Sequence, residues 1–538
     1  MKKLSDAAEN RQDGRVFNFR PALFAAAFFA LGILFARARL FSGASCLWLL
    51  PGLLVPVLAP VFFPGRGLRS VLAAFALLLC SWWGALSFWE EVRAFSAAPG
   101  ISGKCAVVGT VEEKEEFSGG ARLLLSGLSV DGEEVSGKLV ASLPAEFSDR
   151  VKIADRVVLT GSVETDLALS DDYGFRSENV EKSIFYRAEA ESLAVAGRSE
   201  NVFLNVRRRI RDTLYGAMDE QSAAVTYALL VGDTSGIEAG LLENVRYGGI
   251  AHIFSVSGLH VGALYAFVRA LTEKTGLRGL PKLARLFSVS LFILFYAGVC
   301  GFSASVVRAA VMCFVLYASF LLGIKSNLVE NTGIAALVLL AVHPVQVFDL
   351  GFQLSFAACL SIGLFSRFFR DGLDALLPGK RPRAEDKPLS IAAKFRRDAV
   401  SFFSVTLSAQ VGTAPLLLNA FGYLSVWSLF LNCLFVPLVG AFFAVLLAIV
   451  LIACFLPSAA ASVLLYVPSV LWSAALLLFH AVDFAPAGIG KLSGGALAAY
   501  YAFFVVLSGK INFGKRGKFA AASVFLAAFA LSLAFAAG

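Results

Sequence analysis

Two histidines stand with neighbouring serines in an apolar stretch, residues 251–262 (AHIFSVSGLHVG). The chain of 538 residues has only four histidines, and His252 and His260 lie here with Ser257. Histidines eight residues apart reach one metal ion poorly and no carboxylate is adjacent, so the spacing argues against a metal site. Ser257 lacks a G-x-S-x-G context, which argues against a nucleophilic serine. We therefore predict no catalytic residue, metal or cofactor in this stretch.

The same residues suit a packed helix that lines a pathway. Ser257 and His260 are three apart and share one helix face, and His252 lies two turns earlier on roughly the same side. Gly258 and Gly262 have the GxxxG spacing that permits close helix approach. We expect the histidines and Ser257 to line the narrow part of a polar path, and the glycines to hold their helix close to a neighbour.

Further polar side chains interrupt other apolar segments. Ionisable and amide groups inside membrane spans are costly, and they usually face a bundle interior or a water-filled path. For any one of these residues a helix–helix hydrogen bond is the favoured interpretation. Together they indicate a polar cavity, formed by Arg308, Asp349, Gln353, Gln410 and Asn432.

Composition determines the elements that must position these groups. Hydrophobic residues make up 58% and charged residues 16% of the chain, and the mean hydropathy is +0.74, which indicates a polytopic membrane protein and excludes a soluble core. The chain has a net charge of +8, and in a membrane protein much of such a charge comes from basic cytoplasmic loops. The charge is therefore weak evidence for nucleic-acid binding. Seven of the eight cysteines lie in or beside apolar segments, so they indicate packing and no disulfide framework. The chain has no G-x-x-x-x-G-K-[ST] loop, so we expect no P-loop hydrolysis of nucleotides.

The apolar runs predict about 13 transmembrane helices and five regions. Residues 1–96 hold three transmembrane segments, at 21–36, 46–63 and 70–89. The predicted regions that follow are an extracytoplasmic β domain at 97–203, amphipathic interfacial helices at 204–249, a transmembrane channel domain at 250–490 and C-terminal transmembrane helices at 491–538. The ten spans expected after residue 249 are 250–271, 286–302, 304–323, 328–341, 349–366, 399–418, 426–456, 462–481, 493–507 and 520–536. The run at 426–456 contains Pro437, so it is one kinked helix or two half-spans.

Five short β-like stretches, at 106–111, 122–128, 138–143, 156–163 and 184–194, predict a small all-β domain of the OB type. OB-folds often bind nucleic acids or sugars, but fold analogy is weak evidence of function. Residues 97–203 contain 19 acidic and 11 basic side chains, a net charge of −8 that is the wrong sign for a DNA groove. A purely structural ectodomain is therefore at least as good an interpretation.

Basic loops place the N-terminus in the cytoplasm and, with 13 spans, the C-terminus outside. One basic cluster, Arg207, Arg208, Arg209 and Arg211, then lies on the outer side, against the trend. Anchoring to anionic lipid headgroups is the favoured interpretation of this cluster. A landing site for an external polyanion is the alternative.

Five strings occur in order: ALLVGDTSGI, GGIAHIFSVSGLHVG, GFSASVVRAAVM, HPVQVFDLGFQLSFAACLSIGL and LSAQVGTAPLLLNAFGYLSVWSLFLNCLFVPLVG. Together they resemble the competence domain of the ComEC family, and the early spans and β segment resemble that family's N-terminal region. The resemblance implies a channel in the bacterial cytoplasmic membrane that passes single-stranded DNA during natural transformation. It also implies an external DNA receptor and a cytoplasmic ATPase as partners, beside membrane lipids and a possible homo-oligomer.

Many members of that family carry a metallo-β-lactamase-like domain, but these residues contain no His-x-His-x-Asp-His string. We therefore expect no nuclease activity from them and no enzyme. Two alternatives to a DNA channel remain open. A solute transporter would also have intramembrane polar residues, although weak repeats between its halves would be expected. A membrane-embedded transferase would need a positioned base or nucleophile, for which His260 and Asp349 are the only pair to nominate.

Overall fold

The computed structural model describes residues 21–42, 68–117, 119–166, 170–171, 174–175, 177–274, 279, 281–323, 327–376, 391–425, 427–481, 484, 487–488 and 492–507. The spans predicted at 46–63 and 520–536 lie outside these residues. The chain forms two compact units. The first comprises Met1–Trp89, Ser326–Leu424 and Gly488–Gly538, and the second comprises Glu90–Lys325 and Ser425–Ala487.

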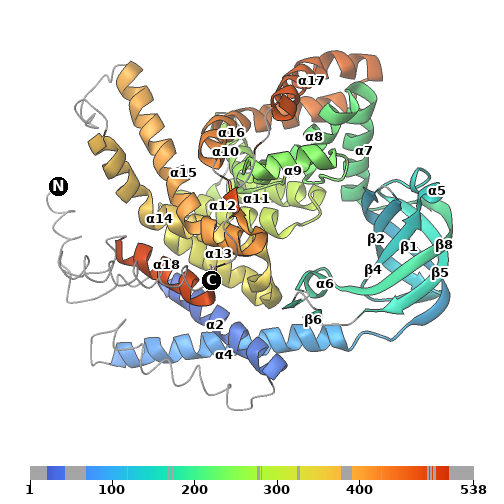
Figure 1. Cartoon of the computed structure of the whole chain (residues 1–538), viewed down its shortest axis with the longest axis horizontal. Helices are drawn as coiled ribbons and strands as arrows, with labels where there is room; N and C mark the ends of the chain where they lie inside the picture. Colours follow the sequence, from blue (N-terminus) through green and yellow to red (C-terminus); the bar gives the residue numbers. More distant parts are fainter. Residues whose placement is uncertain are drawn as a thin grey trace. The chain divides into compact units, whose positions relative to one another are not determined.

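The first unit is helical (Figure 1). Its elements are α2 (Pro21–Ser42), most of α4 (Leu68–Ser96), α13 (Leu328–Val342), the 3-10 helix η4 (Pro344–Phe348), α14 (Leu350–Leu376), α15 (Ile391–Phe421) and α18 (Gly494–Leu507). Helix α2 packs closely on α13 at Gly333, where a Cβ would overlap the backbone nitrogen of Leu23. The carboxylate of Glu330 accepts a hydrogen bond of 2.9 Å from the Ala22 N–H, so a side chain of α13 satisfies a free N–H in the first turn of α2.

The second unit combines helices with a β domain. Its helices are α7 (Val202–Ala217), α8 (Glu220–Val231), α9 (Ala239–Tyr247), the 3-10 helix η2 (Ala251–Ile253), α10 (Gly258–Lys274), α11 (Lys282–Val299), α12 (Ala304–Leu322), α16 (Ser428–Ala453) and α17 (Ser458–Ala481). Their apolar faces share one large core. Pro437 lies inside α16, so the run at 426–456 forms one helix and not two half-spans.

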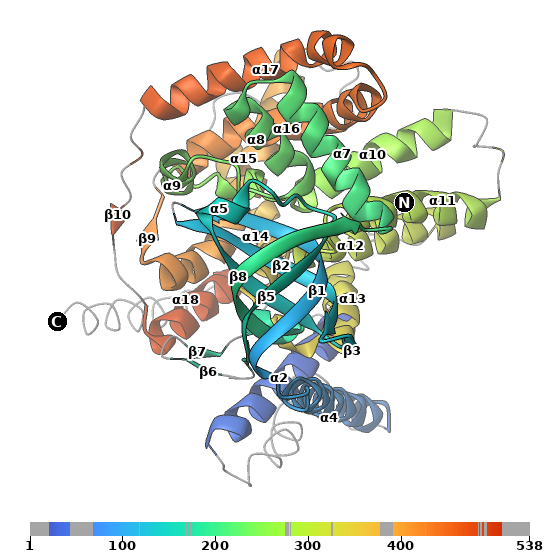
Figure 2. The same cartoon turned by 90° about the vertical axis from the view of Figure 1, so that its right-hand side faces the viewer.

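The β domain is a closed barrel of five strands (Figure 2). Its main strands are β1 (Ser102–Phe117), β2 (Gly120–Val130), β4 (Lys138–Pro144), β5 (Asp155–Thr165) and β8 (Ile184–Arg198). They pair in the order β1-β5-β8-β4-β2, and β2 pairs again with β1, which closes the ring. Only β4 and β8 are parallel neighbours; the other pairs in the ring are antiparallel.

Alternation of side chains explains why these stretches form a barrel. Along β5 the residues at odd positions from Val157 to Val163 are buried or nearly so, and those between them are more exposed. The inward residues of all five strands form one core of aliphatic side chains with Tyr186. All five predicted β stretches are strands, and each strand is longer than predicted. A short strand β3 (Glu133–Val135), the helices α5 (Ala145–Ser148) and α6 (Ser177–Glu181), and the two-residue strands β6 (Ser170–Asp171) and β7 (Gly174–Phe175) complete the domain.

Seven helices among the described residues are long and apolar enough to cross a membrane. They are Pro21–Ala38, Lys282–Val299, Ala304–Leu322, Leu350–Leu376, Ala393–Phe421, Ser428–Ala453 and Ser458–Leu477. The chain is thus a polytopic membrane protein, as predicted. The span predicted at 250–271 is wrong in its first part, because helix α10 begins only at Gly258.

Candidate functional site

The stretch 251–262 begins as an irregular loop, not as a helix. Gly249 has a φ of +75°, a left-handed conformation that favours glycine, and a Cβ on it would overlap the Ser428 side chain at the start of α16. This turn leads into the 3-10 helix Ala251–Ile253, and a non-helical segment follows up to Gly258. His252 is therefore not on α10, and the prediction that it lies two turns before His260 on the same helix face is wrong.

Ser257 and His260 form the N-terminal cap of α10. The Ser257 N–H donates to His260 Nδ1 at 3.0 Å, and the Leu259 N–H donates to Ser257 Oγ at 3.3 Å. His260, at the third helical position, accepts from the N-cap N–H as the glutamate or glutamine of a capping box does, whereas Ser257 Oγ accepts from the second helical N–H and not from the third. Because Nδ1 accepts the backbone N–H, the ring is neutral and carries its proton on Nε2. The two polar residues thus satisfy backbone groups that would otherwise lack partners at the start of the helix.

His260 points into the packed interior of the second unit. Its exposed fraction is 0%, and its ring lies edge-on to Phe443 of α16 with centroids 4.7 Å apart. The Nε2 atom is buried and has no hydrogen-bond partner among the described residues. The imidazole therefore packs α10 against α16. The prediction that His260 faces an open path is wrong.

The glycine pair also differs from its prediction. A Cβ on Gly262 would meet nothing within 4 Å, and one on Gly258 would only reach Ala309 Cβ at 4.0 Å. The prediction that these glycines hold α10 against a neighbour is wrong, because the close glycine contact between α10 and α16 lies at Gly440 instead. A Cβ there would come within 3.2 Å of Leu259 Cδ1. The glycine side of α10 is open backbone.

Two exposed polar residues precede Gly258 in the sequence. His252 and Ser255 are exposed, and Ser255 Oγ donates to the His252 carbonyl at 3.2 Å. In the same unit Arg308 is buried on α12, with an exposed fraction of 2%. Asn432 is half-buried on α16, and its Oδ1 has no hydrogen-bond partner among the described residues.

The other predicted path residues belong to the first unit. Asp349 caps α14, since its Oδ2 accepts from the Phe352 N–H at 2.6 Å. Gln353 Nε2 donates to the Val347 carbonyl at 3.0 Å and fixes the turn between η4 and α14. Gln410 is half-buried on α15. The predicted set is thus divided: Asp349 and Gln353 stabilise one turn, and the residues around α10 lie in the second unit.

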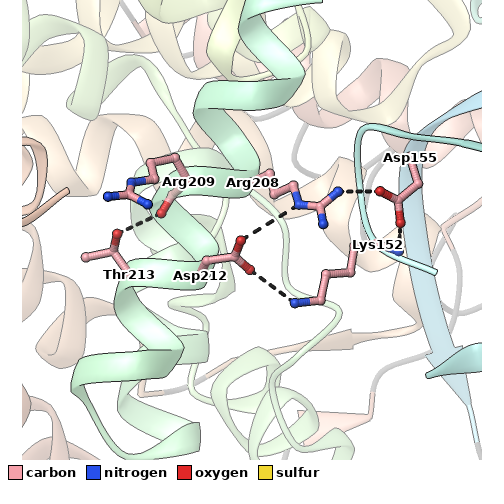
Figure 3. Close-up of polar contacts among 6 residues, drawn as sticks. All are labelled: Lys152, Asp155, Arg208, Arg209, Asp212 and Thr213. Carbon is pink, nitrogen blue, oxygen red and sulfur yellow. Dashed lines mark hydrogen bonds and ion pairs between the residues drawn. The ribbon is translucent and has the colours of Figure 1, made fainter. Parts of the chain in front are cut away.

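The basic cluster lies on α7, and Figure 3 shows two of its arginines. Asn201 caps this helix by accepting from the Phe203 N–H at 2.9 Å. Arg208 forms an ion pair with Asp155 at the start of β5, and its Nε lies 3.8 Å from Asp212 (Figure 3). Arg209 donates through Nε and Nη2 to the Cys454 carbonyl, at 3.0 and 2.7 Å. Cys454 ends α16, so this cation satisfies a terminal carbonyl of that helix.

Arg207 is the most deeply buried member of the cluster. Its exposed fraction is 5%, and Nη1 lies 3.4 Å from the Glu112 carbonyl of β1. Burial lowers the pKa of its guanidinium, but Tyr227 and Asp233 outweigh this effect and the pKa is raised overall. Arg211 differs, because it is half-buried with its guanidinium carbon 5.5 Å above the Tyr215 ring.

These contacts correct the prediction for the basic cluster. Arg207, Arg208 and Arg209 connect α7 to the barrel and to α16, so intramolecular partners occupy the groups that were expected to bind DNA or headgroups. Arg209 is nevertheless exposed, and Arg211 is half-buried with its cation above the Tyr215 ring. Sequence reasoning also missed Phe443 and Gly440, whose roles depend on which helix lies opposite. No group of three or more metal-ligating side chains occurs in the described parts of the chain.

Comparison with known proteins agrees with the motifs around α10. The family described as Competence protein matches residues 229–511, more than half of the chain. ComE operon protein 3 of Bacillus subtilis (strain 168) is 30% identical over 262 residues, which are 49% of this chain and 29% of that protein. The chain therefore matches less than a third of this relative's length, and no solved structure matches it. On the extent of the family match, the chain belongs to the competence protein family.

Proposed function

We propose that this protein is a channel that passes single-stranded DNA across the bacterial inner membrane during natural transformation. The observation that carries the proposal is the family match over residues 229–511, which includes α9 to α17 and the loop before α10. The similarity to ComE operon protein 3 supports it.

Physical chemistry requires a lined path for such a cargo. A polyanion cannot cross about 30 Å of hydrocarbon without polar groups to replace its water. The open glycine side of α10, at Gly258 and Gly262, gives a phosphate chain access to the helix backbone. The exposed His252 and Ser255 precede it and can donate hydrogen bonds without a fixed positive charge, which suits a conduit that must release its cargo. In the proposal these four residues replace His260 as the primary lining.

The remaining polar residues are secondary candidates for the path. Arg308 and Asn432 belong to the second unit with α10, whereas Asp349, Gln353 and Gln410 belong to the first. Asn432 is the best of them, since its buried Oδ1 has no hydrogen-bond partner among the described residues and could accept one from a base or sugar.

The proposed topology has about 13 spans, a cytoplasmic N-terminus and an extracytoplasmic barrel and C-terminus. The distribution of Lys and Arg in the loops supports it. We assign the barrel to the OB type, because five strands in a closed ring with one parallel pair agree with a Greek-key barrel.

An external DNA receptor, a cytoplasmic ATPase and further copies of the chain complete the proposal as partners. Transport is the only activity assigned to these residues, since they contain no His-x-His-x-Asp-His string. No bound cofactor is required for this role.

Uptake of labelled DNA tests the proposal. A strain that lacks the gene should take donor DNA into a nuclease-protected periplasmic or surface state but not into the cytoplasm, and plasmid expression should restore transfer. DNA delivered by electroporation serves as the control, because it bypasses the channel and should transform both strains equally. Normal transformation in the deletion strain would refute the proposal, and a defect confined to growth on one solute would indicate a transporter instead.

A further inference from the structure

A hollow of about 700 Å³ lies on the outer surface of the barrel, across strands β2, β4, β8 and β5. The strand register places its lining residues in two adjacent rows. One row runs through Arg122, Ser142, Glu189 and Ser162, and the next through Leu124, Val140, Arg187 and Glu164. Asn179 of α6 and the nearby Lys182 also line it. The hollow thus has charged sides and an apolar strip formed by Leu124 and Val140.

The three cations of the hollow are already paired. Lys182 Nζ lies 3.5 Å from Glu113, Arg122 Nη1 lies 3.6 Å from Glu115, and Arg187 Nε lies 2.6 Å from Asp166. A phosphate would have to displace these carboxylates.

Two carboxylates of the hollow have no ion pair or hydrogen bond to any described residue: Glu164 and Glu189, both exposed. In the register of β5 and β8, Glu164 faces Arg187 and Glu189 faces Ser162. The two acids are therefore diagonal neighbours, with Cα atoms roughly 7–8 Å apart. Their unpaired charges favour a ligand with cationic groups and repel nucleic acid.

A second, independent feature restricts the chemical class of the ligand. Asn179 lines the hollow, and its Nδ2 atom is buried and has no hydrogen-bond partner among the described residues. A buried N–H without an acceptor is costly, so a ligand that supplies a carbonyl oxygen gains free energy here. A polyamine has cations but no such acceptor. A peptide has both, and the methylene stem of a lysine or arginine can cover Leu124 and Val140.

We propose that this hollow binds a lysine- or arginine-bearing segment of a partner protein. The cationic side chains lie at Glu164 and Glu189, and a backbone carbonyl accepts from Asn179 Nδ2. The proposal stands on the barrel alone and does not depend on DNA transport by the membrane helices.

Fluorescence anisotropy with the full-length protein in detergent tests this assignment. The probe is a labelled, end-blocked hexapeptide with two lysines, and competitors are spermidine and a 12-nucleotide single strand. The groove variant is Glu164→Gln with Glu189→Gln. The matched control is Glu133→Gln with Glu134→Gln on β3, which removes the same charge from exposed positions outside the hollow. Circular dichroism checks that each variant is folded.

The groove variant should bind the peptide about five- to ten-fold more weakly, and the control variant should bind it as the wild type does. Asn179→Ala should also weaken binding of the peptide but leave binding of spermidine unchanged. Equal weakening in the groove and control variants, or weakening in neither, would overturn the proposal. Displacement of the peptide from the wild-type protein by the single strand at least as efficiently as by spermidine, or spermidine binding as tightly as the peptide, would overturn it too.

Discussion

Replacing Arg208 by Gln should destabilise the protein, because this side chain is an internal brace between α7 and the barrel. Arg208 is 15% and Asp155 9% exposed as side chains, so the pair is largely removed from water. Removing one partner of a fully buried pair costs about 3–5 kcal/mol, and the remaining exposure reduces this to about 2–3 kcal/mol here. With about 2 °C per kcal/mol for a large domain, the melting temperature should fall by about 4–6 °C.

Arg211→Gln is the matched control, since it removes the same charge from the same helix. Its contact is a partly exposed cation over the Tyr215 ring, which is worth about 0.5–1 kcal/mol, so the melting temperature should fall by at most about 2 °C. Both values can be measured by scanning calorimetry of the purified full-length protein in detergent.

A double-mutant cycle with Asp155→Asn separates bracing from DNA binding. The amide introduced by this change would keep one oxygen for the Lys152 N–H, which donates to the aspartate at 2.9 Å. If the arginine acts through Asp155, the double variant should be little less stable than Arg208→Gln alone. An unchanged melting temperature for Arg208→Gln, together with a lower salt slope of DNA binding, would show that the residue contacts phosphate and that the bracing argument fails.

Three further predictions concern the helices and the topology. His260→Ala should lower the free energy of unfolding by about 2–3 kcal/mol, because it removes the cap and leaves a cavity beside Phe443. His260→Gln should recover part of this loss, because its amide oxygen can accept from the Ser257 N–H. The melting temperatures of both variants test this. Gly262→Ala should leave the yield of monodisperse protein unchanged, whereas Gly333→Ala should lower it by overlap with the α2 backbone; similar yields for the two would contradict the packing described. Cysteines placed at Ser136 and Ala384 should react with an impermeant maleimide from opposite sides of the membrane, and labelling from one side would refute the topology.

The barrel strands could be predicted closely because their signal is local. Alternation and turn residues mark each strand, and the register follows once one face must be buried. The start of α10 could not be predicted in this way. An apolar run from residue 250 looks continuous, and only the positive φ of Gly249 and the cap at Ser257 end the loop at Gly258. The S-x-x-H string forms one half of a capping box, through the Ser257 N–H and His260 Nδ1, but histidine at its last position hid the signal.

Long-range contacts explain the other errors. A GxxxG string permits close packing but does not select the partner, and here Gly440 rather than Gly262 meets the neighbouring helix. The arginines of α7 have the same pattern as a headgroup anchor. Their partners, Asp155 and Cys454, are 53 and 245 residues away, so no local pattern could show that Arg208 is paired with a carboxylate and that Arg209 donates to a helix-terminal carbonyl.

Helix α7 also makes the second unit mechanically continuous. Arg208 ties it to the barrel at Asp155, and the adjacent Arg209 ties it to the last carbonyl of α16. Helix α16 in turn carries Phe443, which supports the ring that caps α10. Helices are stiff along their length. The three contacts therefore join the barrel, α7, α16 and α10 directly, without a flexible segment at any of the contacts. We therefore expect a pull on the barrel to reach the start of α10 as strain at the turn between Ser257 and His260, and to alter the loop before the exposed backbone of that helix.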